Sequence, residues 1–355
     1  MTRKIAFHLN CLEQGGAERV VTNLANQFAA GGYEVLIATE WYGENEFQTD
    51  ERVRRVHVGL REGDEKKHRL IQFYLRVKYL REFLKKEKPD ILIPFARKAL
   101  YRGLMAAYFI KIPVLISIRT DPAGHYEERA DKIQIPLLFP RADGCVFQTE
   151  GAKAFFAPRL QENSRIILNP INPKYIGVPE PAERTKTVVQ SGRLVDFKNQ
   201  PMLIRAFVEV HKKYPAYDLK IYGGDSFDGT KEILERIIEE NQAQSYVHLM
   251  GASDSLEKEL ADAALFAFTS DWEGLPIVAT DCPCGGPRTI MTHEKDGLLI
   301  PIKDQKALEE GILRLIEDRE LAERLGREAR KIADRAGGQA VYEQWKAYIE
   351  ELCDG

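Results

Sequence analysis

Polar residues follow a short apolar segment in the last third of the sequence, where a strand would end. Residues 265–268, Leu-Phe-Ala-Phe, are typical of a strand buried on both faces, and the polar residues 269–271 come next. Open parallel sheets bind ligands beyond the carboxyl ends of their strands, which places Glu273 where a substrate would lie. Residues 274–276, Gly-Leu-Pro, then form a turn, and residues 277–280 predict the next strand.

A second candidate site follows the apolar residues 187–190, which predict another strand. Gly192 and Arg193 come directly after it, and Lys198 precedes Pro201, a residue suited to the first turn of a helix. An arginine and a lysine that converge where a strand ends and a helix begins make a cradle for a diphosphate. Two basic residues five positions apart would otherwise be ordinary surface charges.

Gly15 and Gly16 lie between a predicted strand, residues 4–10, and a helix over residues 17–30. Glycine at a helix start lets a phosphate approach the free backbone N–H groups, although a plain strand-to-helix turn has the same pattern. The sequence has neither G-x-G-x-x-G nor G-x-x-x-x-G-K-[ST]. The sequence therefore lacks the motifs that would indicate a dinucleotide-dependent oxidoreductase or a P-loop NTPase.

Taken together, the three motifs resemble those of a known family. Residues 15–19 (Gly-Gly-Ala-Glu-Arg), 191–199 and 273–276 (Glu-Gly-Leu-Pro) occur in the order found in the retaining nucleotide-sugar glycosyltransferases of family 4. The resemblance spans nearly the whole chain. It implies the α/β GT-B fold, in which two doubly wound Rossmann-like domains face a central cleft.

The resemblance also implies a domain plan. We expect an N-terminal acceptor-side domain over residues 1–170, a linker over 171–186 and a nucleotide-sugar-binding domain over 187–335. Residues 336–355 would form a C-terminal helix that packs back on the first domain. The alternation of predicted strands and helices agrees with two α/β halves.

By the same resemblance, several residues acquire roles in sugar transfer. Arg193 and Lys198 would stabilise the departing diphosphate, and Glu273 would accept hydrogen bonds from the donor sugar. The donor would also contact a set of loop residues: Gly15, Gly16, Gly192, Gly251, Gly274 and Leu275. Arg119 stands where many members carry a histidine that faces the acceptor, so we expect an acceptor-side or phosphate-binding role.

The expected reaction moves a hexosyl or N-acetylhexosaminyl group from a nucleotide diphosphate sugar, such as a UDP-sugar, to a hydroxyl. The acceptor would be a saccharide or a lipid-linked molecule in surface polysaccharide or glycolipid synthesis. We expect no cofactor, no metal and no nucleic-acid partner, because side-chain cations replace the metal ion. The sequence does not identify the base, the sugar or the acceptor.

One departure from the family pattern affects the donor site. In the family, a helix of about three turns follows the Glu-Gly-Leu-Pro turn and carries a second glutamate, whereas here residues 277–280 predict a strand at once. Neighbouring parallel strands need a crossover of roughly a dozen residues or more. We interpret this as a deleted helix. Asp281, eight residues after Glu273, is a poor substitute, so a catalytically impaired GT-B shell that binds or scaffolds is the alternative function.

Composition places the chain among soluble globular proteins of two domains. Its 355 residues are 44% hydrophobic and 30% charged, and the five scattered cysteines indicate neither a disulfide framework nor a zinc site. We find no signal peptide and no long apolar segment in the sequence, so we expect a cytoplasmic protein that is at most peripheral to the membrane.

Charge is distributed unevenly along the chain. Residues 1–174 hold 28 Lys+Arg against 21 Asp+Glu, whereas the remainder holds 23 against 33. The helix predicted over residues 66–88 is strongly basic, with nine basic residues against two acidic ones and an apolar face of Leu70, Phe73, Val77, Leu80 and Leu84. Such a helix can lie on an anionic membrane surface. The alternative is a helix that packs its apolar face on the sheet and solvates its lysines.

Overall fold

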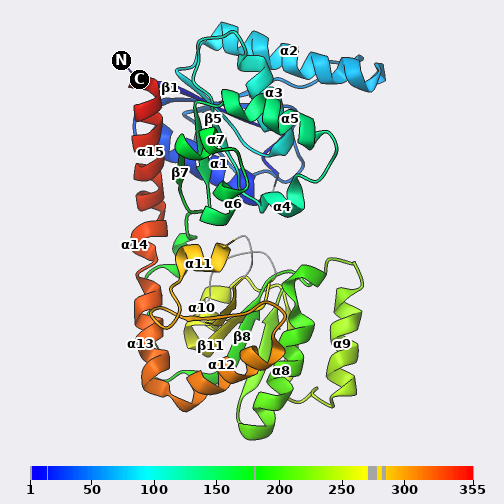
Figure 1. Cartoon of the computed structure of the whole chain (residues 1–355), viewed down its shortest axis with the longest axis vertical. Coiled ribbons are helices and arrows are strands. Elements are labelled where there is room, and N and C mark those ends of the chain that lie inside the picture. The colour runs from blue at the N-terminus through cyan, green and yellow to red at the C-terminus, as the bar shows by residue number, and fades with distance from the viewer. Residues whose placement is uncertain (1, 14, 180, 271–277, 282–284, 355) are drawn as a thin grey trace. The chain divides into compact units, whose positions relative to one another are not determined.

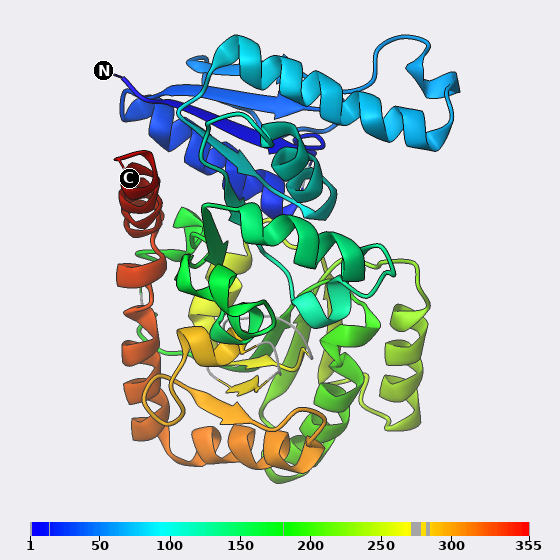
Figure 2. The ribbon, with the colours of Figure 1, turned by 45° about the horizontal axis from the view of Figure 1, so that its top comes forward.

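A computed structural model describes the chain except for residues 1, 14, 180, 271–277, 282–284 and 355. The described residues form two compact units. One contains residues 1–170 together with 338–355, and the other contains residues 171–337. Each unit has a parallel sheet with helices packed against it (Figures 1 and 2).

The sheet of the N-terminal unit is parallel throughout. Its strands are ordered β3-β2-β1-β4 and β5-β6-β7, and the isolated bridges Leu92–Val114 and Phe95–Ser117 join β4 to the start and end of β5. The strands are β1 (Lys4–Leu9), β2 (Glu34–Thr39), β3 (Val53–His57), β4 (Ile91–Pro94), β5 (Leu115–Ser117), β6 (Gly144–Phe147) and β7 (Ser164–Ile166).

The helices of this unit connect successive strands, as a parallel sheet requires. They are α1 (Gly16–Ala30), α2 (Arg69–Glu87), α3 (Arg97–Ala107), α4 (Pro122–His125), α5 (Asp131–Leu138), α6 (Glu150–Ala154), α7 (Pro158–Glu162) and, from the end of the chain, α15 (Gly338–Asp354), with short 3-10 turns η1 (Asp64–Lys66) and η2 (Phe139–Arg141).

The second unit repeats this architecture with one six-stranded sheet in the order β10-β9-β8-β11-β12-β13. Its strands are β8 (Thr185–Ser191), β9 (Asp218–Tyr222), β10 (Val247–Gly251), β11 (Ala263–Phe268), β12 (Val278–Thr280) and β13 (Leu298–Ile300). Its helices are α8 (Gln200–Lys213), α9 (Thr230–Glu240), α10 (Leu256–Asp262), α11 (Gly286–Ile290), α12 (Gln305–Glu317), α13 (Arg319–Arg330) and α14 (Ala333–Ala336), with 3-10 turns η3 (Pro173–Tyr175) and η4 (Asp196–Lys198).

In both units the chain starts in the middle of the sheet, moves outward in one direction and then crosses to build the other half. This strand order is that of the Rossmann fold, and it leaves a crevice at the carboxyl ends of the central strands. The predicted fold class of two doubly wound α/β halves is therefore confirmed.

Of the two alternatives for the long basic helix, packing of its apolar face on the unit holds for only part of α2. Leu80 and Leu84 are buried in α2, but Leu70 is 74% exposed and Phe73 is also exposed. The first turns of α2 extend past most of the unit (Figures 1 and 2) and expose Leu70, Ile71 and Tyr74. Among the described residues, no helix has the length and apolar content needed to span a bilayer.

Helix α15 completes the core of the N-terminal unit. Its Trp345 is fully buried and stacks on Phe95, with ring centroids 5.8 Å apart. The hydroxyl of Tyr348 accepts a hydrogen bond from the Cys145 backbone N–H at 3.2 Å and donates one to the Asn163 carbonyl at 2.9 Å. Helix α15 therefore contacts the amino ends of β6 and β7 and also Phe95, which follows β4.

We predict that Trp345→Ala lowers the free energy of unfolding of the N-terminal unit by about 3–5 kcal/mol, because it leaves a cavity beside Phe95. Denaturant unfolding measures the loss. Glu343→Ala, on the exposed face of the same helix, is the control and should change stability by less than about 0.5 kcal/mol. A small loss in the Trp345 variant would mean that α15 is not part of the core.

Candidate active site

The turn after β8 brings Gly192 and Lys198 into direct contact. A Cβ atom on Gly192 would lie 3.1 Å from Cε and 3.4 Å from Nζ of Lys198, and the φ angle of Gly192 is +155°. Only a residue without a side chain lets the lysine cross the strand end this closely. The sequence pattern Gly-Arg…Lys thus corresponds to a packed arrangement in the structure.

Lys198 is 6% exposed, which is unusual for a lysine. Its ammonium lies 5.3 Å from the ring centroid of Phe268 and 5.6 Å from that of Phe197, within the range of cation–π attraction. Its carbonyl accepts a hydrogen bond from the hydroxyl of Thr269 at 2.8 Å. The loop after β8 is therefore tied to the end of β11.

Backbone hydrogen bonds join the loops that follow β8, β9 and β10. The Gly192 N–H donates to the Tyr222 carbonyl at 2.8 Å, and the Gly223 N–H donates to the Gly251 carbonyl at 2.8 Å. A Cβ on Gly223 would lie 1.9 Å from the Gly192 carbonyl oxygen, so glycine is required there. Two predicted donor-site residues, Gly192 and Gly251, thus lie at the same edge of the sheet, linked through Gly223.

Arg193 is exposed, in contrast to Lys198. Its carbonyl accepts a hydrogen bond from the Gln200 side-chain amide at 3.1 Å, which fixes the turn to the start of α8. The edge thus presents one buried and one exposed cation from a single turn. Diphosphate oxygens can be bound by such a pair, because charge-assisted hydrogen bonds are stronger than neutral ones.

The predicted residues Glu273, Gly274 and Leu275 lie outside the described residues. The last described residues before them, Thr269 and Ser270, are fully buried at the end of β11, and the Ser270 carbonyl accepts a hydrogen bond from the Thr280 hydroxyl at 2.6 Å. The chain therefore leaves the sheet beside Lys198 just before it reaches Glu273.

Two strands flank this stretch and pair directly with each other. Ala267 and Phe268 of β11 are in register with Val278 and Ala279 of β12 in a parallel ladder. Only residues 269–277 separate the two strands in sequence, which is shorter than the usual crossover between parallel neighbours.

Asp281, the formal partner of Glu273 in an E-x7-D pattern, has another role in the structure. Its two carboxylate oxygens pair with Nε and Nη2 of Arg288, and this contact raises the pKa of the arginine. Its backbone N–H donates to the Ile300 carbonyl at 2.7 Å. Asp281 therefore anchors β12 and α11, which argues against its replacing a ligand-binding carboxylate.

Gly15 and Gly16 stand at the start of α1, as predicted. No side chain caps the helix, and Gly16 has open space where a side chain would be. A Cβ on Gly15 would lie 2.2 Å from a carboxylate oxygen of Glu18, so this acidic side chain extends back toward the helix start. The backbone N–H groups can attract an anion, provided the Glu18 carboxylate turns aside.

Arg119 follows β5 at the carboxyl edge of the N-terminal sheet. Its Nη2 donates to the Asn169 side-chain carbonyl, and its guanidinium lies 6.0 Å from the ring centroid of Phe95. Nε and Nη1 are buried without a hydrogen-bond partner among the described residues. Burial lowers the pKa of Arg119 to about 9. A half-buried guanidinium whose buried Nε and Nη1 donors are unused by the described residues fits an anionic ligand.

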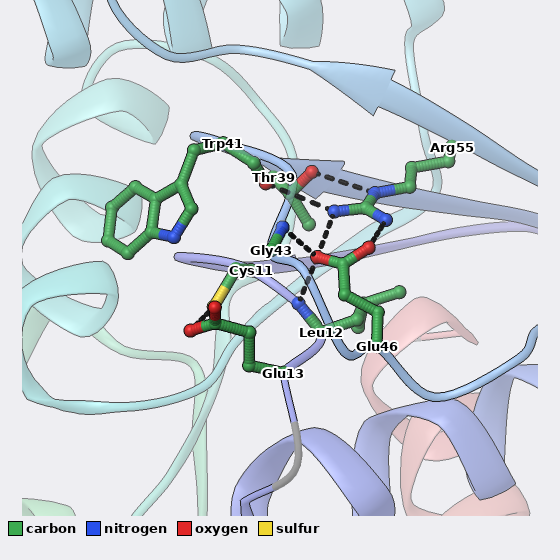
Figure 3. Close-up of polar contacts among 8 residues, drawn as sticks. All are labelled: Cys11, Leu12, Glu13, Thr39, Trp41, Gly43, Glu46 and Arg55. Atoms are coloured by element: carbon green, nitrogen blue, oxygen red, sulfur yellow. Dashed lines mark hydrogen bonds and ion pairs between the residues drawn. The ribbon is translucent and has the colours of Figure 1, made fainter.

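A half-buried ion pair positions the loop that leads to the two glycines (Figure 3). The Glu46 carboxylate pairs with Arg55 of β3 and accepts hydrogen bonds from the backbone N–H groups of Leu12 at 3.0 Å and Gly43 at 2.7 Å. Arg55 also donates to the Thr39 hydroxyl at 3.0 Å and the Trp41 carbonyl at 3.0 Å. The loops after β1 and β2 are thereby held together.

A second polar cluster lies beside it and was missed by the sequence analysis. Glu40, just after β2, pairs with Arg76 of α2 and, at 2.7 Å, with Arg102 of α3. Arg102 also donates to the Asn10 side-chain carbonyl at 2.5 Å. Asn10 ends the strand predicted over residues 4–10 and Glu40 directly follows β2, so polar residues at strand ends were an available signal. Nothing in the sequence indicated Arg102, which lies among apolar residues of its helix.

Two family models match adjacent parts of the chain. The model described as Glycosyltransferase Family 4 matches residues 14–175, and the model described as Glycosyl transferases group 1 matches residues 172–332. Full-length curated relatives include an uncharacterized glycosyltransferase of Haemophilus influenzae, 23% identical, with 98% of this chain and 100% of that protein aligned.

A further relative comes from Campylobacter jejuni and is 22% identical, with 98% of this chain and 99% of that protein aligned. Its name describes an α-1,4-N-acetyl-D-galactosaminyltransferase that acts on a diphosphoundecaprenol-linked saccharide.

Solved structures of similar fold cover essentially the whole chain. Anabaena HepE in complex with UDP superposes with a TM-score of 0.81 at 16% identity, covering 99% of this chain and 100% of that one. Sucrose-phosphate synthase of Thermosynechococcus elongatus superposes with a TM-score of 0.80 at 17% identity, covering 99% of both chains.

The architecture is therefore the GT-B fold. Because the two family matches run together from residue 14 to residue 332, the chain belongs to the glycosyltransferases that these models describe.

We predict that Glu46→Gln lowers the free energy of unfolding by about 2 kcal/mol at pH 7, because charge-assisted hydrogen bonds to Arg55 and two N–H groups are lost. The hydrogen bond from Arg55 lowers the pKa of Glu46 to about 2. Because the pKa of Glu46 is depressed in the folded protein, its ionised carboxylate stabilises the fold at pH values above the ordinary pKa of 4.5. That contribution is lost as the pH falls toward 2.

The stability difference between wild type and this variant should therefore shrink across that pH window in denaturant titrations. Glu44→Gln, at an exposed position in the same loop, is the matched control and should have no such effect. A difference that stays constant down to pH 2 would contradict the assigned ion pair.

Proposed function

We propose that the chain transfers a hexosyl or N-acetylhexosaminyl group from a UDP-sugar to a hydroxyl acceptor with retention at the anomeric carbon. The acceptor is a saccharide or lipid-linked molecule of surface polysaccharide or glycolipid synthesis. The observation that carries the proposal is the Gly192–Lys198 contact, which keeps a buried ammonium at the carboxyl edge of the second sheet.

Transfer from a nucleotide diphosphate sugar creates an oxocarbenium-like centre and a departing diphosphate. Catalysis then depends on groups that stabilise the new negative charge and need no rearrangement as it forms. Lys198 is already held in place by Gly192 and the rings of Phe197 and Phe268. Arg193, on the same turn, supplies a second cation, so the proposed reaction uses no metal ion or other cofactor.

The remaining roles follow from position and from the family pattern. Glu273 accepts hydrogen bonds from the donor sugar, and Gly15, Gly16, Gly192, Gly251, Gly274 and Leu275 contact the donor. Arg119 binds an acceptor-side anion, in agreement with its unused Nε and Nη1 donors. The Campylobacter jejuni relative, whose name specifies a diphosphoundecaprenol-linked acceptor, supports an acceptor that carries phosphate.

The proposed membrane contact of α2 gains support from the exposure of its first turns. Leu70, Ile71 and Tyr74 are exposed on α2, which with its flanking residues carries nine basic residues over positions 66–88, six of them within the helix. Apolar side chains flanked by lysine and arginine are suited to an anionic lipid surface. On this proposal the protein is a peripheral protein at the inner face of the membrane, where a lipid-linked acceptor would be found.

We predict that Lys198→Met weakens UDP binding by about tenfold to a hundredfold, because one charge-assisted hydrogen bond to a phosphate is lost. Isothermal calorimetry with UDP in the presence of EDTA measures binding and tests metal independence together. Lys212→Met, at an exposed position of α8, is the control. Equal affinity in the Lys198 variant would remove this residue from the diphosphate site.

The second candidate function is an inactive GT-B shell that binds a ligand or partner without transferring sugar. It is favoured by the direct pairing of β11 with β12 across nine residues and by the engagement of Asp281 with Arg288. A family member with a helix between these strands has a second glutamate and a helix N-terminus at the diphosphate. This chain has no sequence from which to build that helix.

A donor-binding comparison separates the two candidates. Calorimetry with a panel of UDP- and GDP-sugars would compare wild type with a variant carrying three helical turns and a second glutamate inserted after Pro276. Binding by the insertion variant alone, and not by one with a Gly-Ser insert of equal length, would support the inactive shell. Donor hydrolysis by wild type that Glu273→Ala abolishes would support the enzyme, whereas unchanged hydrolysis would exclude Glu273 from the site.

A further inference from the structure

A pocket lies on the N-terminal unit, at the edge of the sheet opposite the candidate active site. Arg3 precedes β1, Asp90 precedes β4 and Pro113 precedes β5, and all three line a depression of about 610 Å³. The amino ends of the strands therefore form its floor. Because ligands of the reaction bind at the carboxyl ends, this pocket has no part in the sugar transfer. Its volume falls in the range of small-ligand sites.

Positive charge dominates the lining. Arg3, Lys85, Lys88 and Lys111 face one acidic residue, Asp90, whose carboxylate already accepts the Lys4 backbone N–H at 2.6 Å. Arg3 pairs with Asp354 of α15. Within the described part of the chain, no carboxylate forms an ion pair with the three lysines. The pocket therefore has unbalanced positive charge that an anion can neutralise.

The rest of the lining is apolar, which restricts the kind of anion. Leu84, Ile110 and Ile112 contribute hydrocarbon surface between the cations. A small hydrophilic anion would leave this surface wet, whereas an amphipathic molecule covers it and places its charge against the lysines. The chemistry of the pocket thus matches a lipid with a phosphate headgroup.

The loop beside the pocket holds an aromatic side chain in solvent. Phe109 is 88% exposed, and its φ angle of +66° is a left-handed conformation that non-glycine residues rarely adopt. Arg81 of α2 fixes this loop by donating to the carbonyls of Met105 at 2.8 Å, Ala106 at 3.0 Å and Tyr108 at 2.9 Å. The backbone is thus held in a costly conformation that presents an apolar ring next to the cationic pocket.

We propose that this pocket binds the headgroup phosphate of an anionic membrane phospholipid, while Phe109 enters the acyl region beside it. The inference rests on the proposed membrane contact of the N-terminal unit, but it assigns that contact to a defined site away from α2's exposed first turns. Lys85, Lys88 and Lys111 surround the phosphate, and the apolar lining covers the start of the glycerol and acyl chains.

The test is sedimentation of the full chain with vesicles of phosphatidylcholine, alone or mixed with phosphatidylglycerol. The triple variant Lys85→Ala, Lys88→Ala, Lys111→Ala should bind the mixed vesicles about a hundredfold more weakly, since each basic residue at an anionic surface contributes about fivefold. The triple variant Lys212→Ala, Lys213→Ala, Lys306→Ala removes the same charge from exposed positions of the second unit and should bind as wild type does.

Phe109→Trp supplies a readout that does not depend on net charge. Its fluorescence should shift to shorter wavelength with the mixed vesicles and stay unchanged with glycerol 3-phosphate at equal phosphate concentration. A shift with glycerol 3-phosphate alone would identify a soluble phosphate compound as the ligand and overturn the lipid assignment. Equal vesicle binding by both triple variants would overturn the pocket.

A variant of the exposed α2 residues separates this inference from the earlier membrane proposal. If Leu70→Ser, Ile71→Ser abolishes binding and the pocket variant does not, α2 alone makes the contact and the pocket proposal fails. If the pocket variant abolishes binding and the α2 variant does not, the pocket proposal stands and the α2 contact fails. If the wild-type protein binds neither kind of vesicle, both membrane proposals are contradicted. The proposed sugar transfer would not be affected by that result.

Discussion

The arrangement of the second unit depends on one close approach, that of the Lys198 side chain to Gly192. A lysine that is 6% exposed gives up most of its hydration, and folding must compensate for that loss. The compensation visible here includes two aromatic rings and a neighbour without a Cβ atom. A side chain at position 192 would crowd the end of the lysine, since its Cβ would lie 3.1 Å from Cε. A preformed cation of this kind is useful to an enzyme, because its desolvation has already occurred before the ligand arrives.

Both units position the loops after their central strands by the same strand order. In each unit the strand order places a topological switch next to the first strand, so the loops after the central strands open into a crevice. The second unit holds its loops by backbone hydrogen bonds through Gly192, Gly223 and Gly251. The first unit uses side chains instead, with Glu46 and Arg55 joining the loops after β1 and β2 to strand β3. Glycine contacts hold the carboxyl edge of one sheet, and a half-buried ion pair holds that of the other.

Residues that act through local geometry were predicted from the sequence, and residues that act through tertiary contacts were not. The turn after β8, the start of α8 near Pro201 and the glycines before α1 follow from short-range rules on strands, helix starts and glycine. Glu46 sits in an irregular loop, and its partner Arg55 lies in a polar edge strand, β3, that no apolar pattern indicated. The apolar stripe of α2 was compatible with either a membrane surface or packing on the sheet along the whole helix. Only its later turns have a neighbouring helix to cover them, and periodicity cannot reveal where such support ends.

The location of the cations gives the charge asymmetry of the sequence a structural meaning. At the carboxyl edge of the N-terminal sheet, arginines are matched by carboxylates: Arg55 by Glu46, and both Arg76 and Arg102 by Glu40. These contacts hold loops and helices in place, and the two carboxylates cancel two of the three positive charges. Arg119 differs, since its buried Nε and Nη1 have no partner among the described residues. At the amino edge, by contrast, Lys85, Lys88 and Lys111 line an open pocket with a single carboxylate, Asp90, and form no ion pair with any described carboxylate. Paired charges attract few ions, whereas unpaired charges attract many. The excess of basic residues in the first half of the chain therefore attracts anions mainly at the amino edge of the N-terminal sheet and at Arg119.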